Sequence, residues 1–161
     1  MSTTPWVPPT ALERKALLER THSIAIVGAS GNPARSSNFV ITYLLSSSAN
    51  YDIYLVNPRA TEILGQPVFP SLAALPVVPD LVDVFRPSEV LPEVAEEAVA
   101  IGAKAFWAQL GLSNDHATTI AHEAGLDVVM DRCLKIEHAR FHGGLPLAGF
   151  DTGVISRRRA R

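Results

Sequence analysis

The chain has 161 residues, of which 47% are hydrophobic and 19% are charged, and its net charge at pH 7 is −2. This length fits one domain with a sizeable core. The slight acidic balance argues against a nucleic-acid or acidic-membrane partner, and the single cysteine excludes an intramolecular disulfide and a zinc-finger ligand set. Neither a bilayer-spanning apolar run nor a signal peptide is evident, so we expect a cytoplasmic location.

Short apolar runs alternate with longer amphipathic stretches. The runs are mostly continuous, which is typical of parallel strands covered by helices on both faces. They predict strands over 23–28, 52–56, 81–85, 104–108 and 127–130. Capping residues, hydrophobic spacing and C-terminal glycines predict helices over 10–20, 36–47, 88–101 and 113–124.

The proline-rich segment 57–80 is predicted to be a loop with helical turns near 60–64 and 71–75. The order of elements indicates an α/β fold, a doubly wound and mainly parallel five-stranded sheet with strand order 3-2-1-4-5. We expect residues 1–161 to form a single domain, with 1–9 and 143–161 as terminal extensions.

Polar residues follow every predicted strand, at the edge where open parallel sheets bind ligands. Gly28 ends the first strand where a tight turn needs a residue without Cβ, and the next helix directs its first amides toward that edge, which favours an anion. Arg35 adds a guanidinium fork for phosphate. Candidate ligand-binding residues at this edge are Gly28, Ala29, Ser30, Pro33, Arg35, Ser36, Ser37, Asn57, Pro58, Arg59, Arg86, Pro87, Gln109, Gly111 and Cys133.

The first loop is not a complete dinucleotide fingerprint. Ser30 and Pro33 stand where the G-x-G-x-x-G pattern requires glycine. The second strand ends in Asn57-Pro58-Arg59 instead of the acidic residue that binds the ribose diol of NAD. Arg59 suits the additional ribose phosphate of NADP or coenzyme A. An ordinary strand-to-helix turn without a ligand is the alternative.

Seven stretches of the chain follow one another as in a known family. They are 26–30 with Arg35-Ser36, then 55–58, 63–65, 82–87, 102–104, 107–111 and 129–135. In these residues the sequence resembles the small stand-alone CoA-binding proteins, whose domain is similar to the N-terminal domain of the succinyl-CoA synthetase alpha subunit. The resemblance spans 23–138. It implies a Rossmann-like fold in which the Gly/Ser loop holds the phosphates of coenzyme A and Asn57-Pro58 and Arg86 line the groove.

The resemblance implies binding of coenzyme A or an acyl-CoA without catalysis by the chain itself. The ligase domain of the synthetase, with its phosphorylated histidine, has no counterpart in the matched stretches, and no nucleophile–base arrangement is recognisable. Cys133 would lie near the CoA thiol, where it forms a mixed disulfide or serves only in packing. An NADP-dependent reductase and an interaction module that has lost its ligand stay open as alternatives, as does a homo-oligomer.

Overall fold

One sheet of seven strands runs through the described residues, 4–46 and 50–142, of the computed structural model. The strands are β1 (Ser23–Val27), β2 (Asp52–Val56), β3 (Glu62–Ile63), β4 (Gln66–Phe69), β5 (Leu81–Val84), β6 (Ala105–Ala108) and β7 (Asp127–Val129). Their order across the sheet is β3-β4-β2-β1-β5-β6-β7. Only the β3–β4 pair is antiparallel among these strands. The α/β class and the mainly parallel sheet are therefore confirmed.

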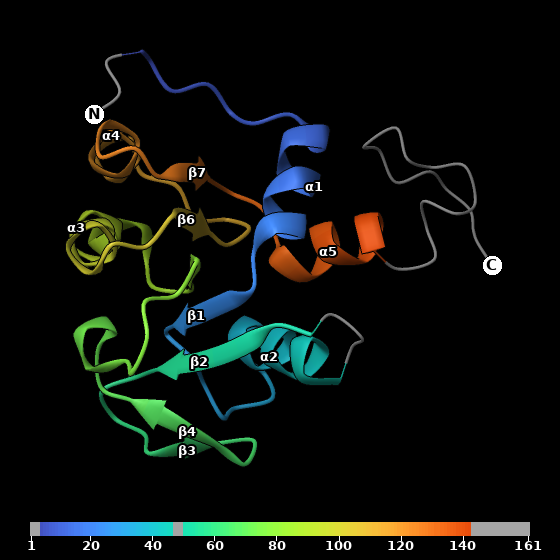
Figure 1. Ribbon diagram of the computed structural model, residues 1–161. Coiled ribbons are helices and arrows are strands. Elements are labelled where there is room, and N and C mark those ends of the chain that lie inside the picture. Colours follow the sequence, from blue (N-terminus) through green and yellow to red (C-terminus); the bar gives the residue numbers. More distant parts are fainter. Residues whose placement is uncertain (1–3, 47–49, 143–161) are drawn as a thin grey trace.

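Helices cover both faces of the sheet. They are α1 (Ala11–Arg20), α2 (Ser36–Ser46), α3 (Leu91–Ile101), α4 (Asp115–Glu123) and α5 (Leu134–His142), with 3-10 turns η1 (Leu72–Ala74) and η2 (Ser88–Val90). Figure 1 shows α3 and α4 on one side of the sheet and α1, α2 and α5 on the other. This is the doubly wound arrangement.

The central strands are buried on both faces, which is why their sequences read as continuous apolar runs. Every residue of β5 and β6 is buried. Successive side chains of β6 enter different layers, Phe106 packing toward α3 and α4 and Trp107 toward α1, α2 and α5. Asp83 is the polar exception in β5. It is paired in register with Trp107, so its side chain points to the same face of the sheet as Trp107.

Two predictions about the sheet were wrong. The expected number of strands was five, but Glu62–Phe69 adds the hairpin β3–β4, so the helical turn expected near 60–64 is absent. Its two-residue loop has positive φ at both Leu64 (51°) and Gly65 (76°), as in a type I′ turn. The turn expected near 71–75 is confirmed as η1.

The expected strand order was also wrong. The strand over 81–85 was expected beyond the strand over 52–56, whereas β5 lies between β1 and β6. The outer position beside β2 belongs to β4, where Leu55 pairs with Val68. Because β4 was not predicted, its place in the sheet was assigned to the next strand along the chain.

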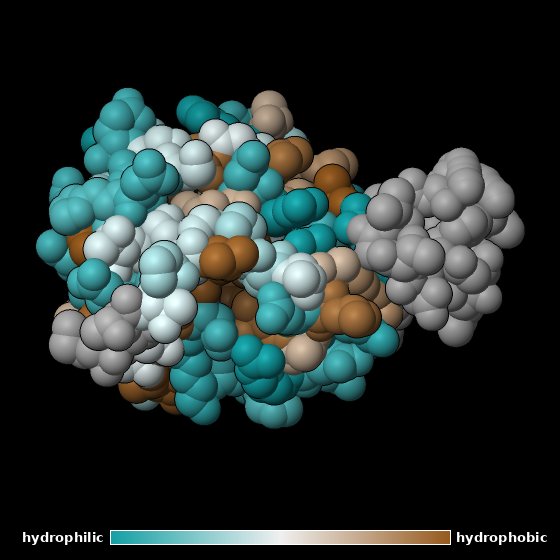
Figure 2. Space-filling model, turned by 90° about the horizontal axis from the view of Figure 1, so that it is seen from above, coloured by the Kyte–Doolittle hydropathy of each residue, from teal (hydrophilic) through white to brown (hydrophobic). Residues whose placement is uncertain are grey.

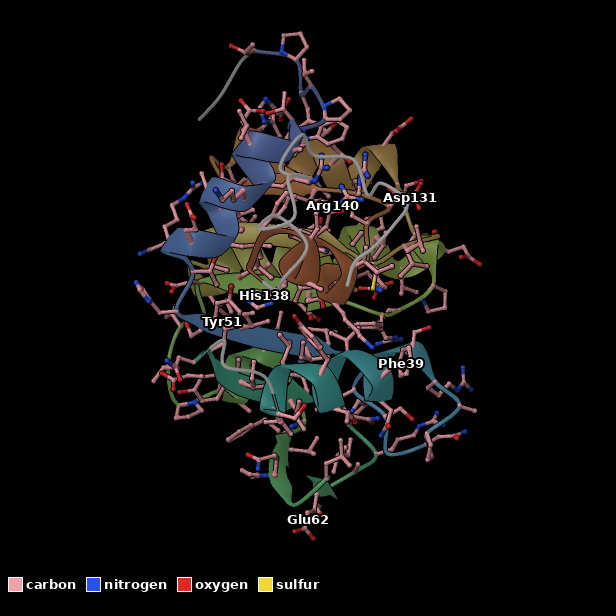
Figure 3. All side chains as sticks on the ribbon, turned by 90° about the vertical axis from the view of Figure 1, so that its right-hand side faces the viewer. Phe39, Tyr51, Glu62, Asp131, His138 and Arg140 are labelled. Carbon is pink, nitrogen blue, oxygen red and sulfur yellow. The ribbon has the colours of Figure 1, made fainter. Side chains whose placement is uncertain are left out.

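Helix α5 packs through polar side chains as well as apolar ones. The hydroxyl of Tyr43 lies 2.8 Å from Nδ1 of His138, and the rings of Tyr43 and Tyr51 both meet the His138 ring edge to face. Figure 3 shows Tyr51 and His138 close together. Burial, with Tyr43 and Glu19 nearby, raises the pKa of Tyr51 to about 12, so its hydroxyl stays protonated and donates to the Leu18 carbonyl.

The expected terminal extensions are only partly visible. Residues 4–9 of the first extension run without regular structure past β7 to α1 (Figure 1), and residues 143–161 lie outside the described part. Viewed from the end that carries α1 and α4, apolar side chains form small patches separated by hydrophilic ones (Figure 2). No helix in the described ranges is long and apolar enough to cross a membrane.

Candidate functional site

A groove follows the carboxyl ends of β1, β2, β5 and β6. It consists of two adjoining hollows, of ≈ 500 and ≈ 430 Å³, that share Gly28, Asn57, Arg59 and Arg86. We call the first the α2 half, because it contains the loop after β1 and the start of α2, and the second the α3 half. The α2 half is lined by Gly28, Ala29, Ser30, Arg35, Ser36, Ser37, Asn57, Arg59, Phe85, Arg86, Gln109, Leu110 and Leu112.

Gly28 makes the turn at the floor of this groove. Its φ is +88°, and a Cβ at this position would lie 3.3 Å from the backbone and Cβ of Phe85. A larger residue would therefore be strained and crowded at once. The amides of Gly28 and Ala29 both donate to the Val56 carbonyl, at 3.0 and 3.2 Å. These two amides extend the sheet and are not available to a phosphate.

The amides that stay without an acceptor at this edge come from the start of α2. No backbone or side-chain acceptor within the described residues bonds the amides of Ser36, Ser37 or Asn38, as expected for the first turn of a helix. Polar groups of the preceding loop bond to one another and to α2. Ser30 Oγ accepts from the Asn32 amide at 3.0 Å, and Asn38 Nδ2 donates to the Ser30 carbonyl at 3.0 Å.

Asn57 joins two loops of the groove. Its Nδ2 donates to the Ala29 carbonyl and its Oδ1 accepts from the Arg59 amide, each at 2.7 Å. Its own amide donates to Phe69 at the end of β4. The Asn57 side chain therefore positions the loop after β1 relative to the loop after β2.

Three arginines supply the positive charge of the groove. Arg35 comes from the loop before α2, Arg59 from the loop after β2 and Arg86 from the loop after β5. All three are exposed. None of the ion pairs between described residues includes them, so no carboxylate of the described residues lies within 4.0 Å of their guanidinium nitrogens.

Four of the expected site residues do not line the groove. Neither half contains Pro33, Pro87, Gly111 or Cys133, whereas the expected residue Pro58 lines the α3 half. The Gly111 amide donates to Oδ1 of Asp131 at 2.6 Å, and Cys133 is half-buried against the core. Gln109 is mostly buried and accepts from the Leu134 amide at the start of α5.

Several lining residues were not predicted. Phe85, Leu110 and Leu112 add apolar surface to the α2 half. The α3 half is lined by Val27, Val56, Pro70, Ser71, Val90, Glu93, Val94 and Glu97 in addition to Pro58 and the shared residues. The residues of α3 gave no signal in the sequence, because their contribution depends on how the helix is rotated against the sheet.

Asp83 carries a buried carboxyl group close to this edge. It is fully buried in β5, and neither of its oxygens has a hydrogen-bond partner in the described part of the chain. Burial raises the pKa of Asp83 well above its ordinary value. It lies two residues before Phe85 and does not line the groove.

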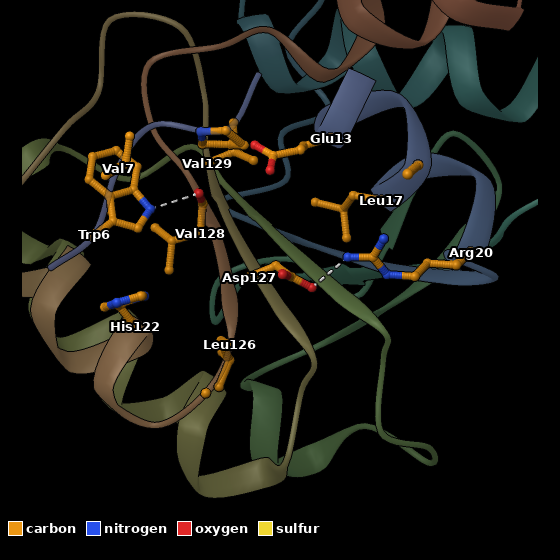
Figure 4. Close-up of a pocket in the computed structure, with 13 residues that line it drawn as sticks. Trp6, Val7, Glu13, Leu17, Arg20, His122, Leu126, Asp127, Val128 and Val129 are labelled. Atoms are coloured by element: carbon orange, nitrogen blue, oxygen red, sulfur yellow. Dashed lines mark hydrogen bonds and ion pairs between the residues drawn. The ribbon is translucent and has the colours of Figure 1, made fainter. Parts of the chain in front are cut away.

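A separate hollow of ≈ 490 Å³ lies between residues 4–9, α1 and β7 (Figure 4). The indole nitrogen of Trp6 donates to the Val128 carbonyl at 3.1 Å, and Arg20 pairs with Asp127 at 2.8 Å. This hollow shares no lining residue with the groove. Among the described residues no group of three or more His, Cys, Asp or Glu side chains is placed to hold a metal ion.

Comparison with known families shows which family the chain belongs to. Residues 22–139 match the family model described as "CoA binding domain". The chain belongs to the CoA-binding domain family. The match includes the whole groove, so the resemblance seen in the sequence is confirmed.

Relatives of this CoA-binding domain include chains of similar length and much longer ligases. The uncharacterized protein YneT of Bacillus subtilis is 43% identical over 131 residues, which cover 81% of this chain and 96% of YneT. A hypothetical protein from Pyrococcus horikoshii has a solved structure with a TM-score of 0.79 and 38% identity, covering 88% of this chain and 99% of that one. This similarity confirms the Rossmann-like fold.

The ADP-forming acetate–CoA ligase I of Archaeoglobus fulgidus is 34% identical over 74 residues, which are 46% of this chain and 10% of the ligase. The CoA-binding domain is thus related to one region of that enzyme. The expected relation to the succinyl-CoA synthetase alpha subunit is supported only loosely, through CoA ligases of this kind.

Proposed function

We propose that this CoA-binding domain binds coenzyme A or an acyl-CoA in the groove and does not catalyse a reaction by itself. The observation that carries the proposal is the set of Arg35, Arg59 and Arg86, which face one groove without a carboxylate partner among the described residues. Three neighbouring guanidiniums repel one another unless an anion lies between them. A ligand with several phosphates therefore fits this edge.

The parts of coenzyme A suit different parts of the groove. The diphosphate fits the free amides of Ser36 and Ser37 together with Arg35, because a helix N-terminus and a guanidinium both favour phosphate oxygens. Arg59, at the end of β2, suits the 3′-phosphate. Phe85, Leu110 and Leu112 offer apolar surface to the pantetheine arm.

Calorimetric titration with CoA, NAD and NADP tests this proposal. We expect CoA to bind more tightly than NAD, because Arg59 stands where NAD needs an acidic diol acceptor. Tighter binding of NADP than of CoA would favour the reductase alternative. Binding of none of the three would favour an interaction module without a ligand.

The proposal also covers the absence of catalysis and the cytoplasmic location expected from the sequence. Incubation with acetyl-CoA, followed by a thiol assay, tests the first of these. Thioester hydrolysis faster than in buffer, and lost in a variant that no longer binds CoA, would show that the domain is an enzyme.

A further inference from the structure

Two carboxylates line the α3 half of a groove that is otherwise suited to anions. Glu93 and Glu97 lie one helical turn apart on α3, so they project from the same face of the helix. Both are exposed. They share this half of the groove with Arg59 and Arg86.

These glutamates are not simply the counter-ions of the two arginines. None of the ion pairs between described residues joins Glu93 or Glu97 to any cation within 4.0 Å. Negative charge beside a phosphate site also weakens anion binding. Their place in the groove therefore calls for a ligand group that donates hydrogen bonds to carboxylates while the arginines hold its phosphates.

The rest of the α3 half offers apolar surface to a ring. Pro58, Pro70, Val90 and Val94 line it together with the two carboxylates. A purine base offers an apolar face to such walls and polar groups at its edge. Adenine carries a hydrogen-bond donor, its 6-amino group, where hypoxanthine and guanine carry a carbonyl acceptor.

We propose that Glu93 and Glu97 accept hydrogen bonds from the 6-amino group of adenine and make the groove selective for adenine nucleotides over hypoxanthine nucleotides. This inference rests on the proposed function, because it assigns the base of the ligand to the α3 half. A carboxylate that meets a 6-carbonyl instead faces a second acceptor. Hydrogen bonds to charged groups are strong enough for a preference of about tenfold or more.

The experiment measures ADP and IDP as competitors of bound CoA, in the wild type and in the variants E93Q, E97Q and E96Q. ADP and IDP differ in the base at the 6-position and the adjoining ring nitrogen. Glu96 is the matched control, because it lies on the same helix and is exposed but does not line the groove. A glutamine amide can donate to a 6-carbonyl, so at a contacting position it removes the preference for adenine.

We expect ADP to compete about tenfold better than IDP in the wild type. E93Q or E97Q should reduce this ratio at least threefold, and E96Q should leave it unchanged. If the glutamates only repel phosphate, or only stabilise the start of α3, both competitors shift together and the ratio stays constant, which overturns the inference. Equal competition in the wild type, or none, overturns it while CoA binding stands. Failure of CoA itself to bind overturns the proposed function, and the inference with it.

Discussion

Arg14 Nε donates to Glu137 Oε1 at 2.6 Å and so joins α1 to α5 across 123 positions of the chain. Both side chains are buried, with 5% and 2% exposed. Arg14 also donates to the Pro9 carbonyl at 2.8 Å, and Arg140 lies 3.5 Å from the second oxygen of Glu137. The Arg14–Glu137 pair therefore joins α1 to α5, and Arg14 also holds the segment that precedes α1.

Glu137→Gln should destabilise the fold by about 3 kcal/mol or more, because removing one partner of a buried ion pair leaves the other charge uncompensated. Urea denaturation measures the change in the free energy of unfolding. Glu19→Gln is the control, since its pair with Lys15 is exposed and 4.0 Å long, and should change stability by less than about 1 kcal/mol. Equal effects of the two substitutions would contradict the role given to Glu137.

Asp83→Asn should stabilise the protein at neutral pH. Burial raises the pKa of Asp83 in the folded state, so the folded protein retains a proton that the unfolded chain releases. The contribution of Asp83 is therefore fully present below the unfolded pKa, about 3.9, and is lost as the pH rises toward the folded pKa. Urea denaturation of both proteins between pH 4 and pH 8 should show a gap that grows with pH. A gap that is constant or shrinks would show that the carboxyl is not held protonated.

Leu64→Asn should raise the free energy of unfolding by about 1 kcal/mol. Leu64 has φ +51° in the hairpin turn, a conformation that costs an ordinary residue roughly 1–2 kcal/mol and that asparagine tolerates. About half of the leucine side chain is exposed (49%), so little burial is lost. Thermal denaturation checks the gain, and lower stability of the variant would mean that the leucine packs more than it strains.

Arg35→Ala should weaken CoA binding by about 1.5–3 kcal/mol, the range of a charge-assisted hydrogen bond. The melting temperature without ligand should barely change, because the side chain is exposed and has no ion-pair partner in the described residues. Arg20→Ala is the matched control away from the groove and should leave the affinity unaltered. A fall in melting temperature with unchanged affinity would assign Arg35 a structural role instead.

Cys133→Ser should leave CoA affinity nearly unchanged, since Cys133 packs against the core and does not line the groove. Intact-mass measurement after incubation with CoA disulfide distinguishes packing from covalent capture. We expect the folded wild type to stay at its original mass. A mass increase by CoA less two hydrogens, reversed by reductant, would place the thiol within reach of the ligand.

The sheet could largely be predicted, because strands buried on both faces leave continuous apolar runs such as those of β5 and β6. The hairpin was missed for an equally physical reason. Strand β3 has two residues, β4 contains Pro67, and the turn has leucine where asparagine is usual. Nothing local in such a segment distinguishes it from a loop.

The position of the site in the fold could be predicted from the sequence, but only some of its lining residues could. Parallel strands bring their carboxyl ends to one edge, so Gly28, Arg59 and Arg86 were expected to lie near one another. Which side of a loop faces the groove depends on contacts made across the fold, as Gly111 and Cys133 illustrate. The same is true of Glu93 and Glu97, which face the groove because of the way α3 packs on the sheet.

The bond from Trp6 to Val128 bears on the association of this chain with others. Strand β7 is the edge strand at one end of the sheet. The Asp127 amide donates to the Lys104 carbonyl, on the side of the neighbouring strand β6, so the backbone N–H and C=O of the next residue, Val128, point away from the sheet. Its carbonyl is an acceptor that a strand from a neighbouring molecule would use, and the Trp6 indole already occupies it. The Trp6 indole and the amino-terminal segment thus cover part of a sheet edge on which another chain could otherwise pair and aggregate. A chain shortened to begin after Trp6 would lose that protection while keeping every residue of the groove.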